Sequence, residues 1–183
     1  TTAGSDITGA NVTLTLAARK LLSVNANTSI TGTTNVTLIS DEMTLASASG
    51  DSIAAGGGGV LLLRAVQNAT NLKLGAAAGS DVSGTGADGT LALDTTDLGA
   101  LDPDSGTIQF GNAASHGNTT INNGASTLTI NAPLSFFSDD FTFNADDDAL
   151  TSDSTISIEA QGTITDGGGD ETTTDITATD FTI

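Results

Sequence analysis

The side chains with the clearest chemical potential are carboxylates in the second half of the chain. Calcium takes about six to eight oxygen ligands, which carboxylates, carbonyls and amides supply. Stacked strands bring like charges to within about 5 Å of one another, so a bound cation would relieve their repulsion. The sequence therefore predicts a calcium site in the region 139–153, with the loop 102–104 as a second candidate. The predicted ligands are Asp139, Asp140, Asp146, Asp147, Asp148, Asp153, Asp102 and Asp104.

The charge of the chain is strongly uneven. Its formal net charge is −18, yet residues 1–74 sum to zero. Residues 75–183 contain no Lys or Arg and 18 of the 22 acidic residues. Contact with phosphate needs Lys and Arg, so a nucleic-acid partner is disfavoured. The simpler alternative to calcium binding is that these acids form a solvated surface.

The remaining candidate catalytic residues lack partners in the sequence. His116 is the only histidine, and its turn-like neighbours mark no nucleophile, so we expect it to be a surface loop residue. The chain has no Cys, which excludes thiolate metal sites and disulfides. Trp and Tyr are absent too, so the usual platform for stacking sugars is missing. We therefore predict that the protein is not an enzyme, with a polysaccharide-degrading enzyme as the less favoured alternative.

Short segments of alternating apolar and polar residues run through the whole chain, and they predict strands that must position any site. Val12-Thr13-Leu14-Thr15-Leu16 is the clearest of them. Clusters of Gly, Asn, Asp and Ser separate the segments, as turns require. The residues predicted to face inward are Val12, Leu14, Leu16, Val36, Leu38, Val60, Leu62, Leu91, Leu93, Ile108, Phe110, Leu128, Ile130, Ile156 and Ile158.

The spacing of the segments predicts a parallel β-solenoid. The sequence Asn-Val-Thr-Leu at 11–14 recurs at 35–38, and Val60 follows Val36 at the same interval at which Val36 follows Val12. One repeat of a solenoid takes roughly 20–45 residues, and this interval lies within that range. We therefore predict one all-β domain over 1–183 with about six turns, regular over about 11–88 and less regular and acidic over about 90–183. The alternative is an antiparallel β-sandwich, whose strands recur at similar spacing.

Two stretches of the sequence resemble filamentous-haemagglutinin-type repeats of large bacterial surface proteins. They are residues 11–74, with the phrases NVTLTLAA and NTSITGTTNVTLIS, and residues 106–134, GTIQFGNAASHGNTTINNGASTLTINAPL. The resemblance implies a right-handed parallel β-helix that is exported to the cell surface. It also implies a role as a fibre shaft or adhesin.

These observations predict a structural segment of an extracellular surface fibre or filamentous adhesin. The terminal alternating strand over 175–183 has no cap, so we expect self-association end to end or continuation into a longer chain. The sequence points to no particular host or matrix partner. No apolar run is long enough for a membrane-spanning helix. The alternative function is a ligand- or ice-binding solenoid, with outward Thr13, Thr15 and Thr37 as candidate ice-binding positions.

Overall fold

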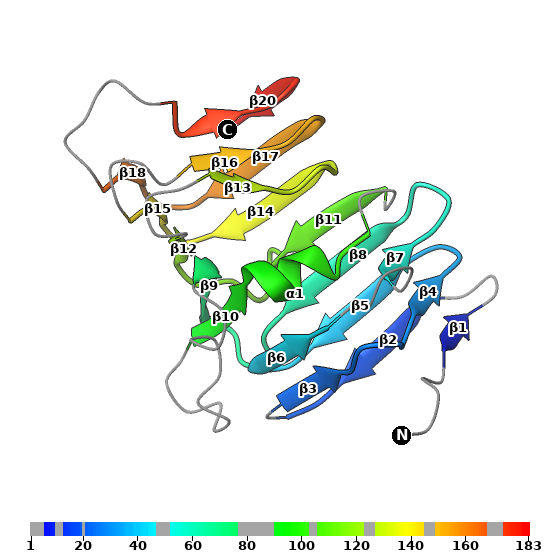
Figure 1. The fold of residues 1–183 in the computed structure, drawn as a ribbon. Helices are drawn as coiled ribbons and strands as arrows, with labels where there is room; N and C mark the ends of the chain where they lie inside the picture. Colours follow the sequence, from blue (N-terminus) through cyan, green and yellow to red (C-terminus); the bar gives the residue numbers. More distant parts are fainter. Residues whose placement is uncertain are drawn as a thin grey trace.

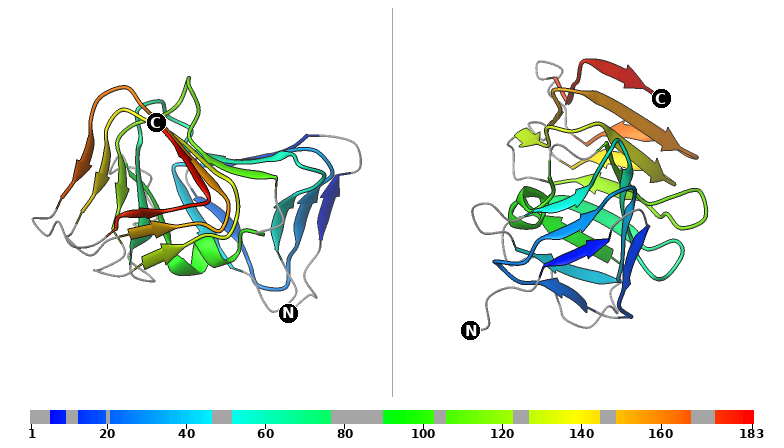
Figure 2. Two further views of the ribbon diagram at one scale, coloured as in Figure 1. Left: turned by 90° about the horizontal axis from the view of Figure 1, so that it is seen from above. Right: turned by 90° about the vertical axis from the view of Figure 1, so that its right-hand side faces the viewer.

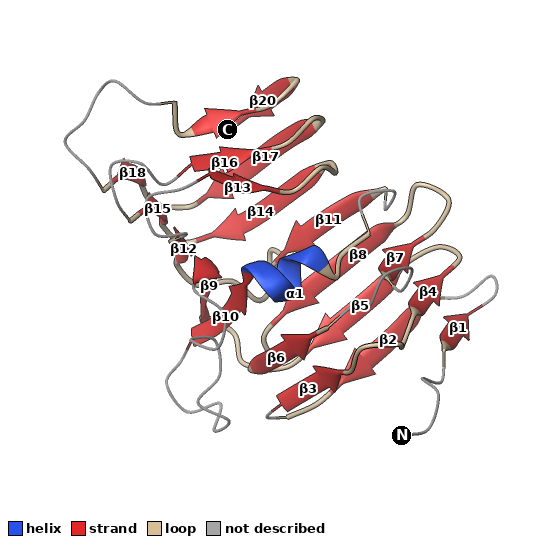
Figure 3. Cartoon of the chain, viewed as in Figure 1, coloured by secondary structure: helices blue, strands red, loops and turns tan. Residues whose placement is uncertain are grey.

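Strands dominate the backbone because β-branched and aliphatic residues alternate with polar ones over short segments. The computed structural model describes residues 6–9, 13–19, 21–46, 52–76, 90–102, 106–122, 127–144, 149–167 and 174–183. This part of the chain contains twenty strands and one short helix (Figure 3).

The strands form three faces that the chain visits in turn (Figure 1). The first face is one seven-stranded sheet, here called the long sheet. Its strands are β2 (Leu14–Ala17), β5 (Val36–Ile39), β8 (Val60–Arg64), β11 (Thr107–Phe110), β14 (Leu134–Ser138), β17 (Thr155–Ala160) and β20 (Asp180–Thr182).

The other two faces are each divided into two sheets. On the second face the strands are β3 (Leu21–Val24), β6 (Glu42–Leu45), β10 (Thr90–Asp94), β9 (Asn71–Ala76), β12 (Thr119–Ile121), β15 (Phe141–Phe143) and β18 (Ile164–Asp166); the last five form the five-stranded sheet. The third face consists of two separate sheets that lie apart in Figure 1: β1 (Ile7–Gly9), β4 (Ile30–Gly32) and β7 (Ile53–Ala55) in the first three turns, and β13 (Thr127–Thr129), β16 (Ala149–Thr151) and β19 (Ile176–Thr177) in the later turns.

Every ladder between described strands is parallel, and all of them except the β9–β10 ladder join equivalent strands of neighbouring turns. The result is a β-solenoid of about six turns, as the sequence predicted. Strands β1 and β20 lie at opposite ends of the stack (Figure 1). Figure 2 shows from two further directions how the strands of each face run side by side. The antiparallel sandwich is thereby excluded.

The turns differ in length more than the repeated sequence indicates. Leu14 pairs with Val36, and Val36 pairs with Leu61. The first turn therefore contains fewer residues than the second. The even interval between the Asn-Val-Thr-Leu copies therefore does not give the register, because corners of different length separate the strands. One such corner contains Gly57 and Gly58, whose φ angles of 64° and 78° favour glycine.

The predicted inward positions Val60 and Leu62 are wrong by one residue. Leu61 and Leu63 are the fully buried residues of β8, and Val60 and Leu62 are only partly buried. Residues 60–63 form an unbroken apolar run, so no alternation marks the inward set. Pairing decides it instead, because Leu61 lies in register with Val36 and Ile108.

Between the third turn and the next, the chain adds one more strand on the second face and a single β-bridge on the third face. After β9 the chain forms β10, which pairs in parallel with β9 and lies close to β6. The short helix α1 (Thr95–Gly99) follows, and Leu101 then bridges to Ile53 on the third face. Asp94 caps the helix, and Asp97 Oδ1 accepts a hydrogen bond from the Leu45 amide at 2.5 Å. No pattern in the sequence predicted this helix.

The interior is a continuous column of aliphatic side chains with one aromatic segment. Phe110 stacks on Phe136 with ring centroids 5.1 Å apart, and Phe141 and Phe143 extend the group. The predicted core residues confirmed as buried are Val36, Leu38, Leu91, Leu93, Ile108, Phe110, Leu128, Ile130, Ile156 and Ile158. Leu14 and Leu16 pack partly buried against this core, and Val12 lies outside the described residues.

Two adjacent substitutions test the register of β8. Leu63→Ala should lower the free energy of unfolding by about 2–5 kcal/mol, because it leaves a cavity in the column. Leu62→Ala makes the same chemical change on the outer side and should cost about 1 kcal/mol or less. Urea unfolding followed by circular dichroism measures both. A larger loss for Leu62→Ala than for Leu63→Ala would reverse the assignment of the inward side.

Candidate functional site

Stacked polar side chains occupy the corner between the long sheet and the five-stranded sheet. Asn71 Oδ1 accepts a hydrogen bond from the Asn118 amide at 3.0 Å, and Asn118 Oδ1 accepts one from the Asp140 amide at 3.2 Å. Asp140 Oδ1 then accepts from the Thr163 amide at 2.8 Å. We call Asn71, Asn118, Asp140 and Thr163 the corner ladder. Each side-chain oxygen satisfies a backbone N–H of the next turn, where the strand ladder has not yet begun.

The same kind of hydrogen bond, from a side-chain oxygen to a backbone amide of the next turn, occurs at other corners. Asn35 Oδ1 accepts from the Val60 amide at 2.8 Å. Asp6 Oδ1 accepts from the Ser29 amide at 3.1 Å. An oxygen-bearing side chain just before a strand therefore ties one turn to the next. Some of the acidic residues thus have a structural role that charge counting alone does not reveal.

His116 lies in the loop between β11 and β12, as expected, but its side chain is only 12 % exposed. Its Nδ1 is 3.0 Å from Asp139 Oδ1, and its Nε2 is 3.2 Å from Gln161 Nε2. A Gln161 N–H donated to Nε2 requires the proton of the neutral ring to sit on Nδ1, facing Asp139. His116 Nδ1 is within ion-pair distance of Asp139 Oδ1, but the geometry of this contact is not that of a hydrogen bond. These contacts link three successive turns.

No hydroxyl group of the described residues forms a hydrogen bond with His116. Its hydrogen-bonding and ion-pair contacts in the described part of the chain are with Asp139 and Gln161. A Ser–His–Asp arrangement needs a hydroxyl within reach of the second ring nitrogen, and Gln161 occupies that side. The arrangement is therefore suited to holding turns together.

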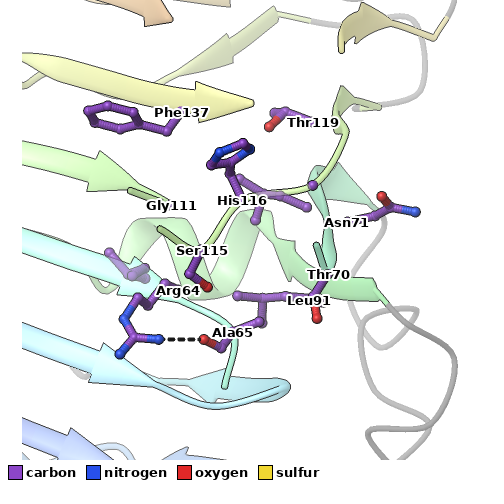
Figure 4. Close-up of a pocket in the computed structure, with 13 residues that line it drawn as sticks. Arg64, Ala65, Thr70, Asn71, Leu91, Gly111, Ser115, His116, Thr119 and Phe137 are labelled. Carbon is purple, nitrogen blue, oxygen red and sulfur yellow. Dashed lines mark hydrogen bonds between the residues drawn. The ribbon is translucent and has the colours of Figure 1, made fainter. Parts of the chain in front are cut away.

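A small cavity lies beneath His116 (Figure 4). Its volume is about 20 Å³, and its walls include Leu63, Leu91 and Phe137. Arg64 lies at its rim and donates a hydrogen bond from its guanidinium to the Ala65 carbonyl at 3.0 Å. A cavity of this size holds about one water molecule. It is too small for an organic substrate.

The described calcium candidates are separated by their places in the fold. Asp139 and Asp140 lie between β14 and β15, and they contact His116 and Thr163. Asp102 Oδ2 accepts from the Ser52 hydroxyl at 2.8 Å on the third face. Within the described ranges, no three Asp, Glu or His side chains are grouped so as to hold a metal ion.

The other predicted calcium ligands give no further grouping. Asp153 lies exposed between β16 and β17, and its carbonyl accepts from the Thr179 hydroxyl at 2.8 Å. Asp104, Asp146, Asp147 and Asp148 lie outside the described residues. Calcium binding therefore stays a prediction.

The outward face of the long sheet does not carry a continuous threonine row. Thr15 and Thr37 are in register, but Leu62 and Gln109 occupy the next two positions of the row. The row continues with Ser135, Ser157 and Thr182. Ice binding depends on a flat and regular array, so this face does not favour it. Thr13 lies just before β2 and is exposed.

Comparison with protein-family models, curated proteins and solved structures gave no match. No helix in the described part is long and apolar enough to cross a membrane.

The corner ladder predicts how Asp140 titrates. Hydrogen bonds from the Thr163 amide, and then from its hydroxyl, hold the pKa of the Asp140 carboxyl below its ordinary value. The carboxylate therefore stabilises the fold above the ordinary Asp pKa, and this contribution disappears as the pH falls through the lowered pKa. Thr163→Val removes the hydroxyl and should raise the Asp140 pKa part of the way, as measured by carboxyl ¹³C NMR titration. Thr129→Val on the third face is the control. An Asp140 pKa that is ordinary in the native protein contradicts this assignment.

Proposed function

We propose that the chain is a structural segment of an extracellular surface fibre or filamentous adhesin. The observation that carries the proposal is the long sheet, in which seven strands from successive turns pair in parallel without interruption. A solenoid of this kind bears load through contacts between neighbouring turns, so adding turns adds length without a new core. The resemblance of residues 11–74 and 106–134 to surface-fibre repeats supports the same role.

The distribution of buried and exposed apolar residues also supports an extended assembly. On the third face Ile30 and Ile53 are each 1 % exposed, whereas Ile7 in the edge strand β1 is 37 % exposed. At the other end Phe181 is in register with Ile156 and is 39 % exposed. The inward rows are thus uncovered only at the two ends of the described stack. A further turn at either end would cover them, whether it comes from the same polypeptide or from another copy.

The charge of the protein suits a long fibre. With a net charge of −18, the sides of neighbouring shafts repel one another. Repulsion between sides suppresses lateral clumping, while the strand edges at the ends stay available for pairing. The proposal assigns no catalysis, and it gives His116, which lies against Asp139 and Gln161 of the two following turns, the role of holding turns together.

A pair of lysine substitutions in β20 tests the end-to-end contact. We expect the protein to form linear oligomers at high concentration, because the edge of β20 can accept another parallel strand. Phe181→Lys places a charge on the inward row that the next turn would cover, so it should abolish those oligomers. Thr182→Lys adds the same charge on the outward side and should weaken them much less. Analytical ultracentrifugation and electron microscopy measure the assemblies.

Two results would count against the proposal. One is a native protein that stays monomeric at every concentration tested. The other is an equal response to the two lysine variants, which would show that the added charge acts generally and not at the inward row.

A further inference from the structure

The outer side of the five-stranded sheet carries polar side chains in register. Along one row, Lys73 pairs with Ala92 on one side and with Thr120 on the other, and Thr142 and Thr165 continue the same row. The side chains between these positions, such as Leu74 and Ile121, point inward and are buried. The corner ladder runs alongside this row, because each of its members shortly precedes the row residue of its own turn.

An open groove of about 310 Å³ lies on this outer side, at β9, β10 and β12. This volume is at the lower end of the range of small-molecule sites, roughly 300–1,000 Å³. Among the lining side chains that the structure describes, Leu72 alone is apolar, and it is 9 % exposed. The polar lining consists of Asn71, Lys73, Thr90, Asn118, Thr120, Asn122 and Asn144. Such a lining suits a ligand that is hydroxylated, and it does not suit a lipid or an aromatic compound.

The hydrogen bonds of the corner ladder determine which side-chain atoms of Asn71 and Asn118 can contact a ligand. The Oδ1 atoms of Asn71 and Asn118 accept backbone hydrogen bonds from the next turn. Their Nδ2 groups are therefore the ends that remain as hydrogen-bond donors. With the Lys73 ammonium, the groove presents an excess of donors. An excess of donors selects a ligand rich in acceptor oxygens.

Lys73 adds a positive charge to the groove. It is half-buried, and it forms no ion pair with any described residue. It is also the last Lys or Arg in the chain, because residues 75–183 contain none. A ligand carboxylate at Lys73 would form a charge-assisted hydrogen bond, which is about twice as strong as a neutral one.

We propose that this groove binds a short acidic saccharide, whose carboxylate contacts Lys73 and whose hydroxyl groups contact the asparagine and threonine side chains. The site has no aromatic platform, so binding rests on hydrogen bonds and charge. The proposal goes beyond a structural role and does not depend on it, because the groove lies on the side of the solenoid and not at its ends.

NMR titration of the native protein with trigalacturonate tests the proposal. The expected result is saturable binding that shifts the side-chain amide signals of Asn71, Asn118, Asn122 and Asn144. The methyl ester of the same trisaccharide lacks the charge and should bind about tenfold more weakly. Lys73→Gln keeps much of the side chain and removes its charge, so it should weaken trigalacturonate binding by about the same factor.

Arg19→Gln is the matched control, because it changes the net charge equally at an exposed position before β3 and should leave the affinity within about twofold. Asn122→Ala provides a second test that leaves the corner ladder intact, and it should weaken binding several-fold. The proposal is wrong if trigalacturonate gives no saturable shifts at millimolar concentration. It is also wrong if sodium sulfate alone gives the same shifts at the same concentration, or if Arg19→Gln and Lys73→Gln weaken binding equally.

Discussion

In-register parallel pairing of equivalent strands is the constraint on which the rest of this structure depends. Apart from β10, which pairs with β9 of the same turn, each strand finds its hydrogen-bonding partner one turn away. A residue in one turn therefore lies about 4.8 Å from its equivalents above and below. Inward positions along the long sheet are therefore mainly apolar, as Leu38, Leu63, Phe110, Phe136 and Ile158 show for one row. Outward positions are free to vary, and the row from Thr37 through Leu62 to Gln109 shows that they do.

The same stacking explains the polar corners. A corner interrupts the strand ladder, so its backbone amides need acceptors from elsewhere. Asn71, Asn118 and Asp140 supply them by reaching one turn along the stack. These bonds hold turns of unequal length in register, and they also orient the asparagine amides beside Lys73. The polar groove is thus a consequence of how the corners are tied together.

Much of the fold could be predicted from the sequence because alternation is a local signal. The inward assignments at Val36, Leu38, Ile108 and Ile158 needed only the neighbouring residues. Leu61 and Leu63 could not be separated from Val60 and Leu62, because an unbroken apolar run has no period and the choice depends on partners in the turns before and after. The short helix after Asp94 was missed because its signal is a single capping box, and Thr95 and Thr96 are weak helix formers.

The candidate sites were harder to predict than the fold, for the same reason. His116, Asp139 and Gln161 belong to three different turns, and nothing local in the sequence marks their contact. The exact length of each turn brings them together, and a shift of one position in register would separate them. Asp140 was expected as a calcium ligand by its charge, and nothing local indicated that its carboxylate accepts hydrogen bonds from Thr163 in the next turn. The lining of the Lys73 groove likewise comes from segments that are distant in sequence.

Distances between spin labels along one outward row test the stacking most directly. The chain contains no Cys, so double-cysteine variants carry labels only where they are placed. One label at Thr37 is combined in turn with a second at Ser135, Ser157 or Thr182, which lie three, four and five strands away in the long sheet. Pulsed electron paramagnetic resonance should give narrow distance distributions that lengthen by about 4.8 Å from each pair to the next. Distances that stay constant or shorten along this series would contradict the stacked parallel solenoid.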